Sequence, residues 1–379
     1  DVSTFDVPKE TVGFLLGAKG STLREMETKH RVFMFFDNDK IRDSRSGPAK
    51  RLYVLGGSRD RDRVMAEAEV GDDVFRDDPT VERLEELAAG MLGKEKALFV
   101  PSGTQSNLCA LLTHCGRGDE YIVGQQAHTY IYEGGGGAAL GGIQPQPLDL
   151  EEDGTLDLEK VEGLVKPDDY HFARTRLLCL ENTTNGRVLP EGHAEQARLL
   201  VDRHGLRLHL DGARLFNAAV RSGRSAREIA APFDSVSICL SKGLGAPVGS
   251  VLAGQAGFIA EARRWRKVVG GGMRQSGLLA AAGIYALENH VERLAEDHAN
   301  ALLLAEGLAQ FESCELDPGR VQTNMVYVRL PGDRAQGLPE RLKEHGVLVY
   351  PGNPMRLVTH LDVSRAEIEQ AVEAFGEVL

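Results

Sequence analysis

Cysteine is scarce in this sequence, and long hydrophobic runs and an excess of basic charge are missing. Five cysteines occur in 379 residues, an odd number, and none belongs to a C-x-x-C pair. This excludes a disulfide framework and a zinc site, and it is typical of reduced cysteines in an intracellular protein. No apolar stretch approaches the roughly 18 residues that cross a bilayer. We therefore expect a cytoplasmic protein with no metal site and no membrane partner. The sequence begins at Asp1 and not at a methionine, so a targeting signal cannot be read from it.

The charge is distributed unevenly along the chain. Residues 1–70 contain 13 Lys and Arg against 12 Asp and Glu, a net charge of +1, whereas the rest carries a net charge of −13. The acidic part is therefore excluded as a general nucleic-acid binder. A length of 379 residues, with 42% hydrophobic and 26% charged residues, predicts a globular protein of two or three domains. The change of character near residue 70 indicates a separate N-terminal module.

This module has the pattern of a small α+β unit. Alternating residues predict a strand that ends at Val7 and further strands over 32–36 and 51–55, and a helix over 58–69 closes the unit. Two short helices are expected between the first and second strands. The predicted order of elements is βααββα.

The loop G-A-K-G joins those two helices. Gly17 and Gly20 let the backbone approach phosphate groups, and Lys19 and Arg24 supply positive charge. With its flanking pattern, this loop resembles that of a type I KH domain over residues 1–69. The resemblance implies a module that clamps about four nucleotides, so single-stranded RNA is an expected partner. A lone G-x-x-G is also an ordinary tight turn, and near-neutral charge favours only weak electrostatic binding.

Two charged residues stand where strands of the larger segment end. Residues 206–210 alternate like a buried strand and lead to Asp211, and residues 235–240 lead in the same way to Lys242 before a glycine-rich turn. The carboxyl ends of strands line the ligand crevice of open α/β sheets, so both side chains are expected in one pocket. Alone, the aspartate could cap a helix and the lysine could be solvated. Together they suit pyridoxal phosphate, whose aldehyde a lysine holds as a Schiff base while a carboxylate keeps the pyridine nitrogen protonated.

A phosphate cradle is expected after another strand. Residues 97–100 form an apolar run, P-S-G-T-Q-S-N follows, and a helix is predicted over 108–114. Gly103 and Thr104 then lie at a helix N-terminus, where free amides and the helix dipole favour an anion. A glycine turn that only caps the helix is the alternative.

Several segments between residues 70 and 379 carry a more specific pattern. They are G-D-D-V-F-R-D-D-P-T, F-V-P-S-G-T-Q-S-N, E-Y-I-V-G-Q-Q-A-H, L-H-L-D-G-A-R-L-F-N-A, C-L-S-K-G-L-G-A-P-V-G-S, G-G-G-M-R-Q-S-G and R-L-V-T-H-L-D-V. Together they resemble low-specificity L-threonine aldolases. The resemblance implies a pyridoxal phosphate enzyme of the α/β aspartate-aminotransferase fold (fold type I). It implies a cofactor-binding large domain over 70–296 and a smaller C-terminal α+β domain over 297–379.

The resemblance also assigns residues to the cofactor. It implies that Lys242 holds the aldehyde, that Asp211 contacts the pyridine nitrogen, and that His128 in Q-A-H stacks on the ring. Gly103 and Thr104 would hold the phosphate. Without the resemblance, His128 reads as a surface or capping residue.

Four further residues are implied around the substrate. Arg214 and Arg356 would clamp its carboxylate, a task suited to the planar guanidinium fork. His171 would contact its hydroxyl, and Arg274 would approach the phosphate from a neighbouring subunit, so a homodimer or homotetramer is expected. Taken singly, each arginine is an ordinary solvated residue.

The implied reaction is retro-aldol cleavage of a β-hydroxy-α-amino acid, L-threonine or L-allo-threonine, to glycine and an aldehyde. His128 or His171, directly or through water, would take the β-hydroxyl proton as the Cα–Cβ bond breaks. A pyridoxal lyase that acts on another amino acid is the nearest enzymatic alternative.

The sequence departs from the family pattern in several places. A short segment of the type R-S-D-T-V-T begins family members and is absent here; Phe75 and Arg76 replace a tyrosine and a glycine, and Thr184 replaces a histidine. The residues that grip the cofactor are retained, whereas turnover depends on the lost groups. Three interpretations remain open: an active aldolase with an appended RNA-binding module, a cofactor-binding pseudoenzyme that works by binding single-stranded RNA, and an artefactual fusion of two unrelated units.

Overall fold

The computed structural model of the chain describes residues 2–8, 33–36, 49–55 and 59–379. These divide into two compact units. The first unit comprises residues 1–83 and 273–285, and the second comprises residues 84–272 and 286–379. The domain boundaries expected after residues 69 and 296 remain predictions.

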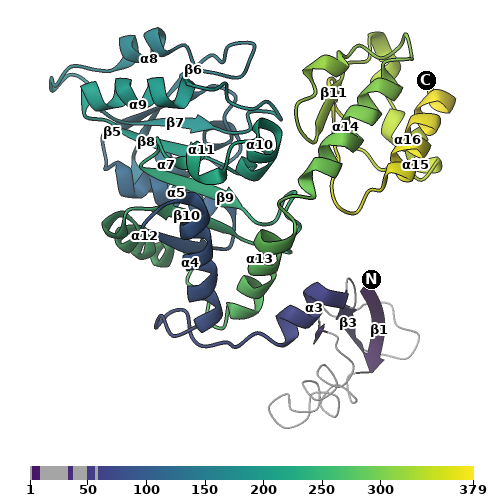
Figure 1. The fold of residues 1–379 in the computed structure, drawn as a ribbon, viewed down its shortest axis with the longest axis horizontal. Coiled ribbons are helices and arrows are strands. Elements are labelled where there is room, and N and C mark those ends of the chain that lie inside the picture. Colours follow the sequence, from purple (N-terminus) through teal and green to yellow (C-terminus); the bar gives the residue numbers. More distant parts are fainter. Residues whose placement is uncertain (1, 9–32, 37–48, 56–58) are drawn as a thin grey trace. The chain divides into compact units, whose positions relative to one another are not determined.

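The first unit contains the three strands predicted for the N-terminal module. β1 (Val2–Pro8) and β2 (Phe33–Phe36) both pair antiparallel with β3 (Ala49–Leu55), in the order β1-β3-β2, and α3 (Arg59–Ala66) follows (Figure 1). The two expected helices and the proposed nucleic-acid contacts lie outside the described residues. Those contacts are Gly17, Lys19, Gly20 and Arg24.

Asp78 joins the starts of two helices in the same unit. Its Oδ1 atom accepts hydrogen bonds from the backbone N–H groups of Thr80 and Val81, at 3.1 and 3.0 Å, and so caps α4 (Pro79–Leu92). Its Oδ2 atom accepts from the N–H of Gly277 at 2.8 Å, where α13 (Gly277–Asn289) begins. A Cβ on residue 277 would lie 2.3 Å from Oδ1, so this junction requires glycine.

The second unit is built around a seven-stranded sheet with the order β4-β10-β9-β8-β7-β5-β6 (Figure 1). All neighbouring strands are parallel except β10, which runs antiparallel to both of its partners. The strands are β4 (Lys96–Val100), β5 (Asp119–Gly124), β6 (Gln144–Leu148), β7 (Arg174–Glu181), β8 (Arg207–Asp211), β9 (Ser235–Cys239) and β10 (Ser250–Gly254). The predicted α/β fold with a mainly parallel sheet is confirmed.

Helices accompany the strands of this sheet. They are α5 (Gly103–His114), α6 (His128–Ile131), α7 (Gly136–Gly141), α8 (Leu158–Leu164), α9 (His193–His204), α10 (Leu215–Ser222), α11 (Ala226–Ala230) and α12 (Ala256–Val268). α5 begins five residues before the expected helix. The cause is a side-chain cap: Ser102 Oγ accepts from the N–H of Gln105 at 3.2 Å.

The C-terminal part has its own hydrophobic core. The antiparallel pair β11 (Met325–Val328) and β12 (Met355–Val358) packs with α14 (Leu294–Leu308), α15 (Leu338–Glu344) and α16 (Arg365–Val378). Short 3-10 turns occur at Pro318–Arg320 and Gly332–Ala335. This is the smaller α+β part that was expected. Among the described residues, no helix is long and apolar enough to cross a membrane.

Candidate active site

The site lies at the carboxyl ends of the central parallel strands. Glu181 at the end of β7 is in register with Asp211 at the end of β8, and Asp211 is in register with Ser237 of β9. A cavity of about 1020 Å³ opens there. Five of the residues expected from the sequence line it: His128, Asp211, Arg214, Lys242 and Arg356.

Asp211 is held by donors on both of its oxygens. The residue is 4% exposed, its Oδ1 accepts the N–H of Ala213 at 3.0 Å, and its Oδ2 accepts from Asn107 Nδ2 at 2.8 Å. Both oxygens of this buried carboxylate are therefore satisfied by hydrogen-bond donors. Asp211 is thus suited to face a protonated ring nitrogen.

Lys242 follows β9 in the glycine-rich turn that the sequence predicted. Its carbonyl oxygen accepts the N–H of Gly245 at 2.8 Å, and Gly245 has a φ of 74°, which favours glycine. The turn directs the half-buried lysine into the cavity that Asp211 also lines. The predicted meeting of an amine and a carboxylate in one pocket therefore occurs.

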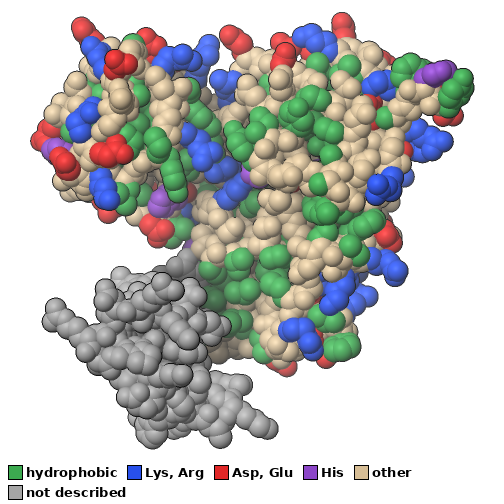
Figure 2. Space-filling view, turned by 180° about the vertical axis from the view of Figure 1, so that it is seen from behind, with side chains coloured by type: hydrophobic (Ala, Val, Ile, Leu, Met, Phe, Trp, Pro, Cys, Tyr) green, Lys and Arg blue, Asp and Glu red, His purple; other side chains and the backbone are tan. Residues whose placement is uncertain are grey.

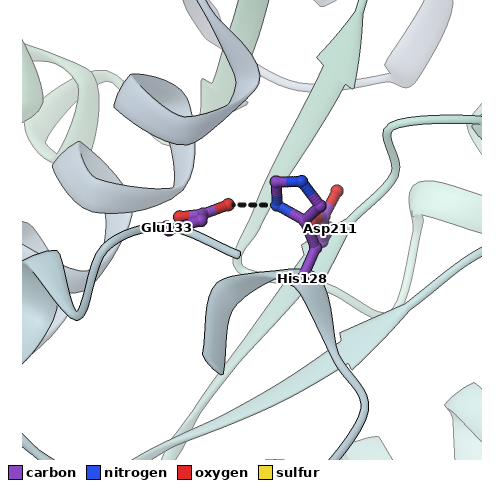
Figure 3. Close-up of side chains that lie close together, drawn as sticks. All are labelled: His128, Glu133 and Asp211. Atoms are coloured by element: carbon purple, nitrogen blue, oxygen red, sulfur yellow. Dashed lines mark hydrogen bonds and ion pairs between the residues drawn. The ribbon is translucent and has the colours of Figure 1, made fainter. Parts of the chain in front are cut away.

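His128 is fixed by two carboxyl groups. Its Nδ1 lies 2.8 Å from Glu133 Oε1 (Figure 3). Its backbone N–H donates to Glu181 Oε2 at 2.9 Å. The hydrogen bond to Glu133 raises the pKa of His128 above its ordinary value, although partial burial opposes this. Burial, followed by the proximity of Asp211, raises the pKa of Glu181 to about 7. Ligand atoms of His128, Glu133 and Asp211 lie within 4.8 Å of one another, so this is a dense electrostatic cluster.

Two arginines reach the same cavity from different elements. Arg214 precedes α10, and Arg356 lies on β12 opposite Tyr327 of β11. Burial lowers the pKa of Arg214, and its buried Nε has no hydrogen-bond partner among the described residues. On the face drawn in Figure 2, basic and histidine side chains gather at a hollow in the surface. A guanidinium group that lines a cavity is suited to a carboxylate ligand.

Gly103 and Thr104 lie at the N-terminus of α5, as predicted. A Cβ on residue 103 would lie 2.8 Å from Cys239 Sγ and 3.6 Å from Ser250 Oγ, so the helix start packs closely on β9 and β10. Gly103 and Thr104 are half-buried, and a helix N-terminus favours an anion such as a phosphate.

Four expected residues, Gly103, Thr104, His171 and Arg274, are not among the residues that line the cavity. The side chain of His171 is 64% exposed and pairs with Asp169 at 2.7 Å, and His171 is absent from the residues that line the cavity. The expected contact of His171 with the substrate hydroxyl remains a prediction. Arg274 forms a two-pronged ion pair with Asp72 in the first unit. Its expected contact with a phosphate in a neighbouring subunit remains a prediction.

Four polar residues in or beside the site were not predicted from the sequence: Asn107, Glu133, Glu181 and Tyr327. Glu181 could have been found, because it ends a buried strand just as Asp211 does. Asn107 and Glu133 carry no local signal, since one lies on the buried face of α5 and the other in the turn after α6.

Known proteins resemble this chain over both of its parts. The family model for beta-eliminating lyases matches residues 56–331, and the model for KH domains matches residues 2–68. The low specificity L-threonine aldolase of Escherichia coli strain K12 is 55% identical over 84% of this chain and 94% of its own length. The chain belongs to the low-specificity L-threonine aldolase family. An Arabidopsis thaliana aldolase of that name is 44% identical over 83% of this chain and 91% of its own length.

Solved structures show the same fold. A threonine aldolase from Leishmania major has a TM-score of 0.73 and 23% identity and covers 86% of this chain and 97% of its own length. This aldolase family depends on pyridoxal phosphate, and the site meets the requirements of that cofactor. A lysine, a buried carboxylate, a histidine and two guanidinium groups line one cavity.

Proposed function

We propose that this chain cleaves L-threonine and L-allo-threonine to glycine and acetaldehyde. The observation that carries the proposal is the presence of Arg214 and Arg356 in the same cavity as Lys242 and Asp211. A pair of guanidinium groups gives an amino acid's carboxylate a fixed position beside the cofactor residues. The high identity to the aldolase of Escherichia coli supports the same reaction.

In this proposal each residue has a defined task. Pyridoxal phosphate, when bound, supplies the sink for the electron pair released from the Cα–Cβ bond. Lys242 would hold it, Asp211 would keep its ring nitrogen protonated, and the amides of Gly103 and Thr104 would bind its phosphate. The arginines would bind the substrate carboxylate and so orient the bond to be broken.

His128 is the proposed proton acceptor. Its Nδ1 faces Glu133 at 2.8 Å, and this fixes the tautomer in which Nε2 carries the free electron pair. The β-hydroxyl proton moves to Nε2, the Cα–Cβ bond breaks, and the hydroxyl carbon becomes the aldehyde carbonyl. One proton is then returned to Cα, which gives glycine. Because Glu133 raises the pKa of His128, the acceptor form grows as the pH rises through that raised value.

Full-length protein with added pyridoxal phosphate tests this proposal. Glycine and acetaldehyde should form in equal amounts from L-threonine and L-allo-threonine. Lys242→Ala should abolish turnover, whereas Lys343→Ala, a change at an exposed lysine of α15, should not. Turnover of another amino acid alone would replace the proposal with a different pyridoxal lyase, and β-phenylserine is the informative third substrate. Cofactor binding without any turnover would favour the pseudoenzyme.

A second activity, binding of single-stranded RNA by residues 1–69, is supported by the match to the KH family model. Gly17→Asp together with Gly20→Asp places two carboxylates where the loop would approach phosphates. The double variant should lose retention of a labelled single-stranded RNA and keep aldolase turnover. Equal retention by the wild-type protein and the double variant would remove this proposal.

A further inference from the structure

Asn107 of α5 is a buried amide that contacts both carboxylates of the site. It is 1% exposed, and its Nδ2 lies 2.8 Å from Asp211 Oδ2 and 2.8 Å from Glu133 Oε1. An amide nitrogen has two hydrogens, and ionised carboxylates only accept. Each hydrogen of Asn107 therefore has one acceptor, and the orientation of the amide is fixed.

The other end of the amide is satisfied by a buried histidine. Oδ1 of Asn107 lies 3.1 Å from Nε2 of His209, which must donate because the oxygen can only accept. Nδ1 of His209 then accepts from Ser235 Oγ at 2.8 Å, and Ser235 Oγ accepts from His114 Nε2 at 2.7 Å. Every proton in this chain of hydrogen bonds has an assigned place.

The two histidines of this hydrogen-bond network, His209 and His114, are held neutral. Burial lowers the pKa of His209 to about 3 and that of His114 to about 4. They therefore add donors beneath the site without adding charge. The negative charge of Asp211 is left for a cation on its cavity side.

Glu133 extends the connection to the histidine that faces the cavity. Its Oε1 accepts hydrogen bonds from both Asn107 Nδ2 and His128 Nδ1, each at 2.8 Å. Burial raises the pKa of Glu133, and the hydrogen bond from His128 is the largest effect that lowers it again. Without the amide, two like charges in a buried site would face each other with a donor missing.

We propose that Asn107 is a positioning residue that holds Asp211 and, through Glu133, His128 in register on the cofactor ring. The proposal deepens the proposed function and rests on the roles given there to Asp211 and His128. Asn107 touches neither the reacting atoms nor the cavity, and it acts only through the two carboxylates. It links Asp211, which would contact the ring nitrogen, to His128, which would stack on the ring.

Two variants separate positioning from packing. Asn107→Leu keeps the branching of the side chain, with larger methyl groups, and removes both donors. Asn107→Asp keeps the shape but adds a third carboxylate, which regains one donor when it is protonated. Asn217→Leu is the matched control, because Asn217 is likewise buried, at 2% exposure, and its Nδ2 lies 3.1 Å from Nε2 of a histidine, His298.

Affinity for pyridoxal phosphate is the readout, measured by titration of its visible absorption against pH. Asn107→Leu should raise the Kd at least about tenfold at every pH, the effect of losing two hydrogen bonds to buried carboxylates. Asn107→Asp should weaken binding most at high pH and recover toward wild type as the pH falls. The groups that face this position and enter the comparison are Glu133, Asp211, His128, His209, and Tyr121 and Cys179 near Glu133.

One result would overturn the proposal. It is a Kd for pyridoxal phosphate that stays within about twofold of wild type at every pH in both variants, although each variant has lost hydrogen bonds to the carboxylates. Unfolding of both variants beside a folded Asn217→Leu would also overturn it, because the network would then be structural. Cofactor affinity is read without turnover. A wild-type protein that binds the cofactor and leaves threonine intact would thus contradict the proposed function and leave this inference standing.

Discussion

The carboxylate of Glu181 accepts a hydrogen bond from the backbone N–H of His128 at 2.9 Å. This contact ties the end of β7 to the first residue of α6, and it places a second carboxyl group beside Asp211, with which Glu181 is in register. Burial and Asp211 raise the pKa of Glu181 to about 7. Its titration is therefore linked to the position of His128 near neutral pH.

Glu181→Gln should change the pH dependence of stability in the cofactor-free protein. The folded state holds the Glu181 proton to a pH of about 7, whereas the ordinary value is 4.5. The raised pKa makes a stabilising contribution to the free energy of unfolding that is fully present at low pH. This contribution is lost as the pH rises from 4.5 to about 7. The variant should therefore gain stability relative to wild type across that window, by about 1 kcal/mol or more at pH 8. Urea unfolding at pH 5 and pH 8 measures the difference.

Glu373→Gln, at an exposed position on α16, is the control and should shift neither value. A stability difference for Glu181→Gln that is constant between the two pH values would contradict the linkage.

Arg214→Lys and Arg356→Lys should weaken substrate binding. A lysine cannot reproduce a two-pronged contact with a carboxylate, and the loss of one charged hydrogen bond is worth about 1.5–3 kcal/mol, a factor of roughly ten to a hundred. We expect KM for L-threonine to rise by that factor while the Kd for pyridoxal phosphate stays unchanged. Arg365→Lys, on the exposed start of α16, should leave both constants as in wild type. An unchanged KM in both site variants would refute the carboxylate clamp.

Gly103→Ala should destabilise the fold through a single contact. The added Cβ would lie 2.8 Å from Cys239 Sγ. Overpacking costs about 1–3 kcal/mol, which exceeds the gain of about 0.5–1 kcal/mol from alanine in a helix. In a Cys239→Ala background the clash is absent, so the same change should be neutral or stabilising. A double-mutant cycle of thermal unfolding measures this coupling, and additive effects would show that the contact is unimportant.

Arg274 should act across a subunit interface if the expected oligomer forms. Arg274→Ala and Lys242→Ala should each be inactive alone. After denaturation and joint refolding, a mixed dimer contains one site with both defects and one with neither, so about a quarter of the sites should be intact. Turnover of the mixture measures this recovery. Failure to recover activity, with mixed dimers present, would place Arg274 in its own subunit's site or outside any site.

The sequence and the structure agree best where the signal is local. The strands that lead to Asp211 and Lys242, and the helix start at Gly103, follow from hydrophobic alternation and glycine turns. The side chain of His171 pairs with Asp169 and does not line the cavity, so the role expected for this residue stays a prediction. Glu181 ends a buried strand as Asp211 does, so the same reasoning from the sequence could have predicted both residues.

The sequence by itself determined the α/β fold, the carboxylate and lysine at neighbouring strand ends, and the glycine turns around them, since each depends on residues close together in the chain. Only the tertiary structure decided that Asn107 bridges Asp211 and Glu133, and that Arg214 and Arg356 share a cavity. These contacts join side chains from separate elements. Their geometry is fixed by packing and by the need to satisfy buried polar atoms, which no local pattern encodes.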